Sequence, residues 1–309
     1  MRLLSLGKRS MIFCLIVGAS SCTHTGEKDK STAQSDETQN LSLKEEYQLG
    51  AKVGSLVLGN YAPLESQFNR YATAMARYLA MYSTRPVLFK GYRASLIDCA
   101  DLAAISTPGG FIFLSKPLVE ATANEDELAG VIAHEVAHIA LRHGEMSIRR
   151  KAAAQKSRKE TESLLDDVTD LADFFLPAAS DKDAEKTLEQ VKRDRETYGK
   201  HVSDLAEVMK VYKYNNNQEY AADKMALEIL LDAGYDPQKY ANFVARNFST
   251  VDRIKNTKKT PIKMFETHPL DEDRVKRIRA AIKGWKPGPD SRSRDTRFAK
   301  FKALAAKAS

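Results

Sequence analysis

Cysteine is scarce in this chain of 309 residues, which contains only three. Small secreted domains that depend on disulfides carry cysteine at a much higher density. Cys14 lies in an apolar N-terminal segment, Cys22 follows that segment, and Cys99 stands by itself. The sequence therefore predicts no disulfide framework, and Cys99 is expected to be a small core residue.

Long apolar runs are also missing beyond the first 22 residues, because charged residues interrupt every later run. A helix that spans a membrane needs about 20 apolar residues. Residues 1–22 have a basic start, the short apolar run Met11–Val17 and then small residues, which is the layout of a secretory signal. We therefore expect a signal segment and no membrane-spanning helix.

The signal ends in Ala19-Ser-Ser-Cys22, which resembles a bacterial lipobox. In such a signal the cysteine becomes the lipidated first residue of the mature protein. We expect lipidation at Cys22, a flexible polar tether over residues 23–42, and a lipid-anchored protein of the bacterial cell envelope. It would face the periplasm, at the outer membrane rather than the inner. Leucine is usual at the position of Ala19, so a plain cleaved signal is the alternative.

Net charge is low outside the C-terminal end, although the formal total is +7. Residues 286–309 hold seven basic and two acidic residues and read as a basic tail. Neither a basic patch interleaved with aromatic residues nor a known nucleic-acid motif accompanies them. The sequence therefore predicts no nucleic-acid partner, and it leaves the oligomeric state open.

Residues 43–285 have the pattern of one folded domain. Apolar residues recur every three or four positions from Leu43 to Met81, which predicts two helices with a turn at Asn60–Pro63. Residues 149–217 are highly charged and predict long helices inserted between the halves of the domain.

Short strands are expected between these helices and a later one. Pro86–Lys90 and Tyr92–Ile97 predict a first strand or pair of strands. Leu102–Ile105 and Phe111–Leu114 flank Pro108-Gly-Gly110 in the manner of a hairpin. The predicted fold class is α+β and mostly α-helical.

The later helix is expected to run from Asn124 to about His143. Asn124 is a capping residue, and Glu127 stands in the capping-box position three residues on. Gly144 predicts the end of the helix.

Within this helix, His134-Glu-Val-Ala-His138 places two histidines four residues apart, and therefore on one face. Both imidazoles can reach one ion, which is the geometry that zinc needs from two nitrogen ligands. Glu135 is placed to act as the general base on an attacking water. A chance match on an amphipathic helix is the alternative. The apolar neighbours Val131 and Ile132 favour a metal site with one Zn²⁺ per chain.

A catalytic zinc takes three protein ligands and leaves one position for water. His143 is half a turn out of phase with His134 on a helix, which argues against it. Glu219 opens Glu219-Tyr-Ala-Ala-Asp223 on a separate predicted helix, so the two carboxylates share one face. We favour His134, His138 and Glu219 as ligands, with Asp223 accepting the outer N–H of His134.

These residues resemble the zinc metalloendopeptidases of the HtpX-like, Oma-like and BepA-like family, a gluzincin group. The family joins His-Glu-x-x-His to Glu-x-x-x-Asp, and this chain adds Ala233-Gly-Tyr-Asp-Pro237, then Thr267-His-Pro269 and Arg274. The resemblance covers Lys44 to Ile282. It implies a zincin-like metallopeptidase fold with a small β-sheet edge next to the zinc helix.

The resemblance also implies a substrate-binding edge. Ala103–Gly110 looks like the family's active-site edge strand, along which an extended peptide adds as a further strand. Ala103 stands where the family usually has asparagine, so the side-chain contact of that asparagine is not expected here. The residues expected to bind substrate are Ser106, Pro108, Gly109 and Gly110.

Two further residues match the family spacing. His268 is expected to donate to the oxyanion of the reaction intermediate, or to touch zinc in a resting enzyme, unless it merely precedes Pro269 at a helix entry. Arg274 is expected to orient substrate or to brace the site through a carboxylate, with a surface salt bridge as the alternative.

The expected function is that of a zinc-dependent metalloendopeptidase that hydrolyses polypeptide substrates. The resemblance implies quality control of misfolded or misassembled envelope proteins. A zinc-stabilised chaperone or assembly factor that holds clients without cutting them is the alternative, although Glu135 speaks against it. An exopeptidase would need a feature that captures a free chain end, and the sequence shows none.

Overall fold

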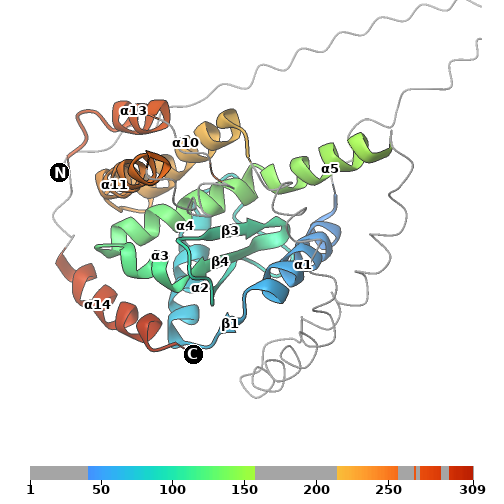
Figure 1. Cartoon of the computed structure of the whole chain (residues 1–309), viewed down its shortest axis with the longest axis horizontal. Coiled ribbons are helices and arrows are strands. Elements are labelled where there is room, and N and C mark those ends of the chain that lie inside the picture. Colours follow the sequence, from blue (N-terminus) through green and yellow to red (C-terminus); the bar gives the residue numbers. More distant parts are fainter. Residues whose placement is uncertain (1–40, 157–213, 257–267, 269–271, 287–291, 309) are drawn as a thin grey trace, which may run out of the picture. The chain divides into compact units, whose positions relative to one another are not determined.

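The structure is a computed structural model that describes residues 41–156, 214–256, 268, 272–286 and 292–308 (Figure 1). The predicted signal, Cys22, almost all of the tether, and most of the charged insertion lie outside the described residues. No helix in the described ranges has both the length and the apolar character needed to cross a membrane.

Helices dominate the described residues, and the few strands are confined to the first half of the chain. The strands are β1 (Pro63–Leu64), β2 (Arg93–Ile97), β3 (Ala104–Thr107) and β4 (Phe111–Ser115). The helices are α1 (Leu43–Asn60), α2 (Gln67–Ala80), α3 (Lys116–Ala121), α4 (Glu125–Ala140), α5 (His143–Lys156), α10 (Asn216–Asp232), α11 (Pro237–Asn256), α13 (Glu272–Ala281) and α14 (Arg292–Ala306). The predicted fold class, α+β and mostly α-helical, is confirmed.

The strands form a mixed sheet in the order β1-β2-β4-β3. β2 runs parallel to β4, whereas β3 and β4 are antiparallel and are joined by the short turn Pro108–Gly110. The predicted hairpin is therefore confirmed. Pro86–Lys90 is not a strand, because β2 begins only at Arg93. The structure also adds the short strand β1, which begins at the last residue of the expected turn at Asn60–Pro63.

Helix α4 lies at the centre of the fold, and all sixteen of its residues are buried. It runs alongside β3 (Figure 1) and packs against α2, α10 and α11 as well. Its apolar residues Leu128, Ile132 and Val136 are completely buried. A helix that is covered on all sides must find partners inside the protein for each of its polar side chains.

The first turn of α4 shows how such partners are supplied. It carries three consecutive acidic residues, whose negative charges interact favourably with the positive end of the helix dipole. All three are buried, so they also need partners within the protein. Arginines from α11 and α14 pair with them: Arg297 with Glu125, Arg294 with Asp126, and Arg246 with Glu127. Ion pairs thus connect the start of α4 to α11 and α14, two helices from the C-terminal part of the chain.

Helix α14 belongs to the segment that the sequence analysis set apart as a basic tail. Phe301 stacks on Tyr71 of α2 with ring centroids 4.2 Å apart, and Phe298 is buried. Lys302 donates to the backbone carbonyl of Thr122, just before α4. Residues Arg292–Ala306 therefore pack onto α2, α3 and α4 and contribute to the core.

The end of α4 differs from the prediction. The helix stops at Ala140, and Arg142 adopts a left-handed backbone with φ 57°. Helix α5 then begins at His143 and continues through Gly144. Glycine usually fills the left-handed position that ends a helix, but here Arg142 does so, and its guanidinium binds Glu145 at 3.2 Å. The expected end at Gly144 was therefore wrong.

A close approach of α1 to the hairpin turn predicts one sensitive glycine. A Cβ on Gly50 would lie 1.6 Å from the carbonyl oxygen of Pro108, so the backbone would have to move. We expect Gly50→Ala to lower the free energy of unfolding by about 3 kcal/mol. Gly59→Ala in the same helix is the control, because its Cβ meets nothing within 4 Å. It should be neutral or stabilise by up to about 1 kcal/mol. Urea unfolding that shows equal stability of both variants would contradict the packing described.

Candidate metal centre

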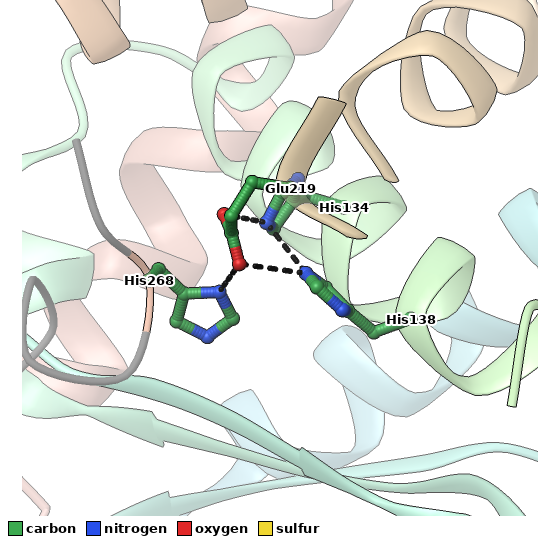
Figure 2. A group of neighbouring side chains, drawn as sticks. All are labelled: His134, His138, Glu219 and His268. Atoms are coloured by element: carbon green, nitrogen blue, oxygen red, sulfur yellow. Dashed lines mark hydrogen bonds and ion pairs between the residues drawn. The ribbon is translucent and has the colours of Figure 1, made fainter. Parts of the chain in front are cut away.

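Four buried side chains meet at one point beside the middle of α4 (Figure 2). One potential ligand atom from each lies within 4.8 Å of the others. The cluster joins parts of the chain that are far apart in the sequence: two residues come from α4, one from α10 and one from just before α13. Its members are His134, His138, Glu219 and His268.

The helices α4 and α10 determine the positions of His134, His138 and Glu219. His134 and His138 share one face of α4 because they are four residues apart. Glu219 lies in the first turn of α10, whose start is held by Asn215, and the Asn215 side chain accepts a hydrogen bond from the backbone of Gln218. The carboxylate of Glu219 is therefore presented from a capped helix end toward the two imidazoles.

The spacing of these atoms suits a tetrahedral metal. Nε2 of His134 and Nε2 of His138 are 3.0 Å apart, and each lies 3.4 Å from an oxygen of Glu219. Two zinc–ligand bonds of 2.0–2.1 Å at the tetrahedral angle would put the ligand atoms about 3.3 Å apart. The two nitrogens and the carboxylate thus fit around one zinc ion.

Glu135 lies next to this group and is completely buried. Neither of its carboxylate oxygens accepts a hydrogen bond from a described residue, and Oε1 lies 3.5 Å from Nε2 of His268. A buried carboxylate without donors is costly, which suggests that its partners at work are a metal, water or substrate.

Asp223 lies one turn after Glu219 on α10 and faces the other side of the His134 ring. Its Oδ1 is 3.0 Å from Nδ1 of His134. Burial disfavours the charged imidazolium, but the carboxylates of Asp223 and Glu219 outweigh it and raise the pKa of His134 to about 9. The ring therefore has a carboxylate at its outer nitrogen and points Nε2 into the cluster.

Arg274 of α13 is the cation that balances the two carboxylates of α10. Its Nη1 lies 2.6 Å from Oε2 of Glu219, and its Nε and Nη2 donate to both oxygens of Asp223. Burial alone would raise the pKa values of these acids. The guanidinium instead holds the pKa of Glu219 well below its usual range and lowers that of Asp223 to about 2. Arg274 is itself buried, so its ion pairs are not on the surface.

His138 has different neighbours at its outer nitrogen. Nδ1 of His143 lies 2.9 Å from Nδ1 of His138, and the ring of Tyr214 stacks on the His138 imidazole at 4.0 Å with an angle of 15°. Burial and the charge of His134 hold the pKa of His138 well below its ordinary value, and burial lowers that of His143 to about 4. These low pKa values favour the neutral form of both rings.

His268 faces two acidic side chains. Its Nδ1 lies 3.1 Å from Oε1 of Glu219, and its Nε2 points toward Glu135. Figure 2 shows the ring on the side of Glu219 away from His134. Its position is compatible with a metal ligand or with a donor to substrate.

The residues expected at the substrate edge lie beside the cluster but are buried. Ser106 belongs to β3, the outermost strand of the described sheet, which pairs only with β4 there. Pro108–Gly110 pack beneath α1, where the backbone N–H of Gly109 contacts the carboxylate of Glu46. The structure therefore brings Ser106 near His138 but covers the turn with a helix.

The sequence did not predict three contacts around the cluster, which Tyr240, Tyr214 and His143 make. Tyr240 donates to Oδ1 of Asp223 at 2.8 Å, and Tyr214 covers His138. Neither tyrosine lies in a motif that would have indicated this. His143 was set aside as a zinc ligand on the assumption of a continuous helix, and its contact with His138 depends on the break at Arg142.

Comparison with known families decides the class of protein. A model of peptidase family M48 matches residues 66–282, which is more than half of the chain. The chain belongs to peptidase family M48. M48 peptidases are metalloproteases, so the family accounts for a metal site, and the resemblance inferred from the motifs is confirmed. The cluster at His134, His138, Glu219 and His268 could hold that metal.

Several curated proteins are similar to this M48 chain. One is the β-barrel assembly-enhancing protease of Yersinia pestis, with 28% identity over 68% of this chain and 38% of the relative. The protein of that name from Escherichia coli K12 is 24% identical over 85% of this chain and 49% of the relative. A putative one from Vibrio cholerae is 26% identical. The chain thus spans half or less of the relatives' length.

The geometry predicts which substitutions remove the metal from this M48 protein. We expect the purified protein to retain about one zinc ion per chain, because a catalytic zinc takes three protein ligands. Glu219→Ala should lose most of it after dialysis against a weak chelator, since two imidazoles alone bind zinc much less tightly. Metal content by elemental analysis is the measurement.

The matched control is Glu228→Ala, an exposed glutamate on the same helix. It should keep the wild-type zinc content. Full zinc occupancy in Glu219→Ala would exclude Glu219 as a ligand.

Proposed function

We propose that this chain is a zinc-dependent metalloendopeptidase that cuts polypeptides at internal peptide bonds. The observation that carries the proposal is the meeting of His134, His138 and Glu219 at zinc-ligand spacing beside the buried carboxylate of Glu135, which accepts no hydrogen bond from a described residue. Membership of family M48 supports it. A chaperone that only held its clients would have no use for a general base at this position.

Three residues would hold the zinc ion: His134, His138 and Glu219. When bound, zinc would polarise the scissile carbonyl and make water a better nucleophile. Glu135 takes the proton of the attacking water on one of its carboxylate oxygens and later delivers it to the leaving amine. This carboxylate is completely buried, and Nε2 of His268 lies 3.5 Å from its Oε1.

The neighbouring residues have supporting roles in this proposal. Asp223 accepts from the outer nitrogen of His134 and so fixes that ring. Arg274 braces Glu219 and Asp223 against each other through its guanidinium. His268 donates to the oxyanion that forms during attack, and the alternative is that it contacts the zinc in a resting enzyme.

The substrate is proposed to bind as an extended peptide along β3, where backbone groups give affinity without strong demands on side chains. Ser106 would line this edge, whereas Pro108, Gly109 and Gly110 would shape the turn that ends it. Because the relatives are named for enhancing the assembly of β-barrels, we propose misfolded or misassembled envelope proteins as substrates.

The domain organisation remains part of the proposal. Residues 1–22 would form the signal, residues 23–42 the tether, and residues 43–285 the peptidase domain with a charged insertion at 149–217. Helix α14, which follows residue 285, contributes to the core of this domain. Lipidation of Cys22 would hold the enzyme on the periplasmic side of the outer membrane. The signal pattern and the lipobox-like Ala19-Ser-Ser-Cys22 support this location.

Glu135→Gln tests the proposed activity. The amide keeps the size of the side chain but cannot take a proton, so cleavage of an unfolded protein such as casein should fall at least about 100-fold while the zinc content stays at the wild-type level. Gel analysis and metal content are the measurements. Mass spectrometry of the products should show internal cleavage sites.

Glu228→Gln, on an exposed position of α10, is the control and should cut at the wild-type rate. Undiminished cleavage by Glu135→Gln would end the proposal. In cells, clients that stay full-length with both the wild-type protein and Glu135→Gln would favour the chaperone alternative.

Cys22→Ser tests the anchor. Without the thiol no lipid can be attached, so the protein should move from the membrane fraction to the soluble periplasmic fraction. Cys99→Ser, which changes a buried cysteine in the folded domain, should stay with the membrane. If the wild-type protein is already soluble, the signal is a plain one.

A further inference from the structure

The two zinc-binding histidines of α4 have different partners at their outer nitrogens. Nδ1 of His134 faces the carboxylate of Asp223 at 3.0 Å, whereas Nδ1 of His138 faces another imidazole nitrogen, Nδ1 of His143, at 2.9 Å. Metal-binding histidines almost always donate their second N–H to an acceptor, because this fixes the tautomer and the direction of the ring.

The position of the protons follows from this geometry. If Nε2 of His138 gives its lone pair to a metal, the ring carries its proton on Nδ1. A distance of 2.9 Å between two nitrogens requires one donor and one acceptor. Nδ1 of His143 must then be the acceptor, so its own proton lies on Nε2.

The backbone is arranged to bring these rings together. On a continuous α-helix, residues five apart point about 140° away from each other, so His143 could not face His138. The left-handed backbone of Arg142 ends α4 and starts α5 in a new direction. The pairs of Arg142 and Arg149 with Glu145 hold the first turn of α5 in place.

His138 is also enclosed. It is 1% exposed and His143 is 4% exposed, so neither ring is open to bulk solvent. The ring of Tyr214 covers one face of the His138 imidazole. This stacking does not prevent rotation of the His138 imidazole within its own plane. A hydrogen bond to Nδ1 of His143 would restrict that rotation.

We propose that His143 is a positioning residue for the metal site. Its Nδ1 accepts the Nδ1–H of His138 and so holds the tautomer and the ring direction in which His138 presents Nε2 to zinc. This inference depends on the proposed zinc site and adds to it a partner for the second histidine, in the role that Asp223 has for the first.

Two substitutions at His143 separate the effect of the hydrogen-bond acceptor from the effect of the ring's volume. His143→Phe keeps an aromatic ring and removes the acceptor. His143→Asn loses the ring but places an amide oxygen at about the position of Nδ1. The readout is the zinc affinity of the full-length protein, purified in detergent and measured by competition with a chromophoric chelator. The visible spectrum of the Co²⁺-substituted protein reports on the ligand field.

We expect His143→Phe to bind zinc about 10 to 100 times more weakly than the wild-type protein, which is the usual effect of removing such a partner. His143→Asn should stay within about threefold of wild type and keep its Co²⁺ bands, whereas His143→Phe should shift them. The metal-free forms of both variants should unfold at similar temperatures. His143→Leu, also without an acceptor, takes the place of the Phe variant if the larger ring prevents folding.

Wild-type affinity in the acceptor-free variant would overturn the inference and leave the zinc site intact. An equal loss in His143→Asn and His143→Phe would also overturn it, because only a packing role would explain that result. A wild-type protein that binds no zinc would overturn both this inference and the proposed function.

Discussion

Complete burial of α4 is the constraint from which the arrangement of the other helices follows. This helix carries acidic residues in its first turn and two histidines and Glu135 in its middle, and none of them reaches solvent. A buried charge without a partner is much more costly than a paired one. Arginines from α11 and α14 therefore meet the first turn, while α10 brings Glu219 and Asp223 to the histidines. The structural and the functional contacts of α4 satisfy the same requirement.

Arg274 shows how this requirement is met within the site. Glu219 and Asp223 lie one turn apart and are both buried, so their negative charges would repel each other and favour protonation. The guanidinium of Arg274 contacts both, and it keeps their pKa values low. Glu219 is then ionised, which is the form in which it would bind the proposed zinc ion. Tyr240, which donates to Asp223, completes the partners of that carboxylate among the described residues.

The sheet and the break at Arg142 lie on two sides of the candidate metal centre. β3 lies beside α4 and is the outermost strand of the described sheet, while the turn that follows lies beneath α1, where Gly50 closely approaches Pro108. On the other side, the left-handed Arg142 turns α5 so that His143 meets His138. The chain spans half or less of the length of the curated relatives. All four residues of the candidate metal centre lie within residues 66–282, which the family model matches.

The sequence alone determined what depends on local spacing. Two histidines four residues apart share a helix face, and so do Glu219 and Asp223, while Asn124 indicates a helix start. The hairpin around Pro108–Gly110 was also predictable. Only the tertiary structure decided that α14 packs into the core, that Tyr240 donates to Asp223, and that His143 contacts His138. These contacts depend on a left-handed arginine and on pairs between distant helices, which leave no periodic signal in the sequence.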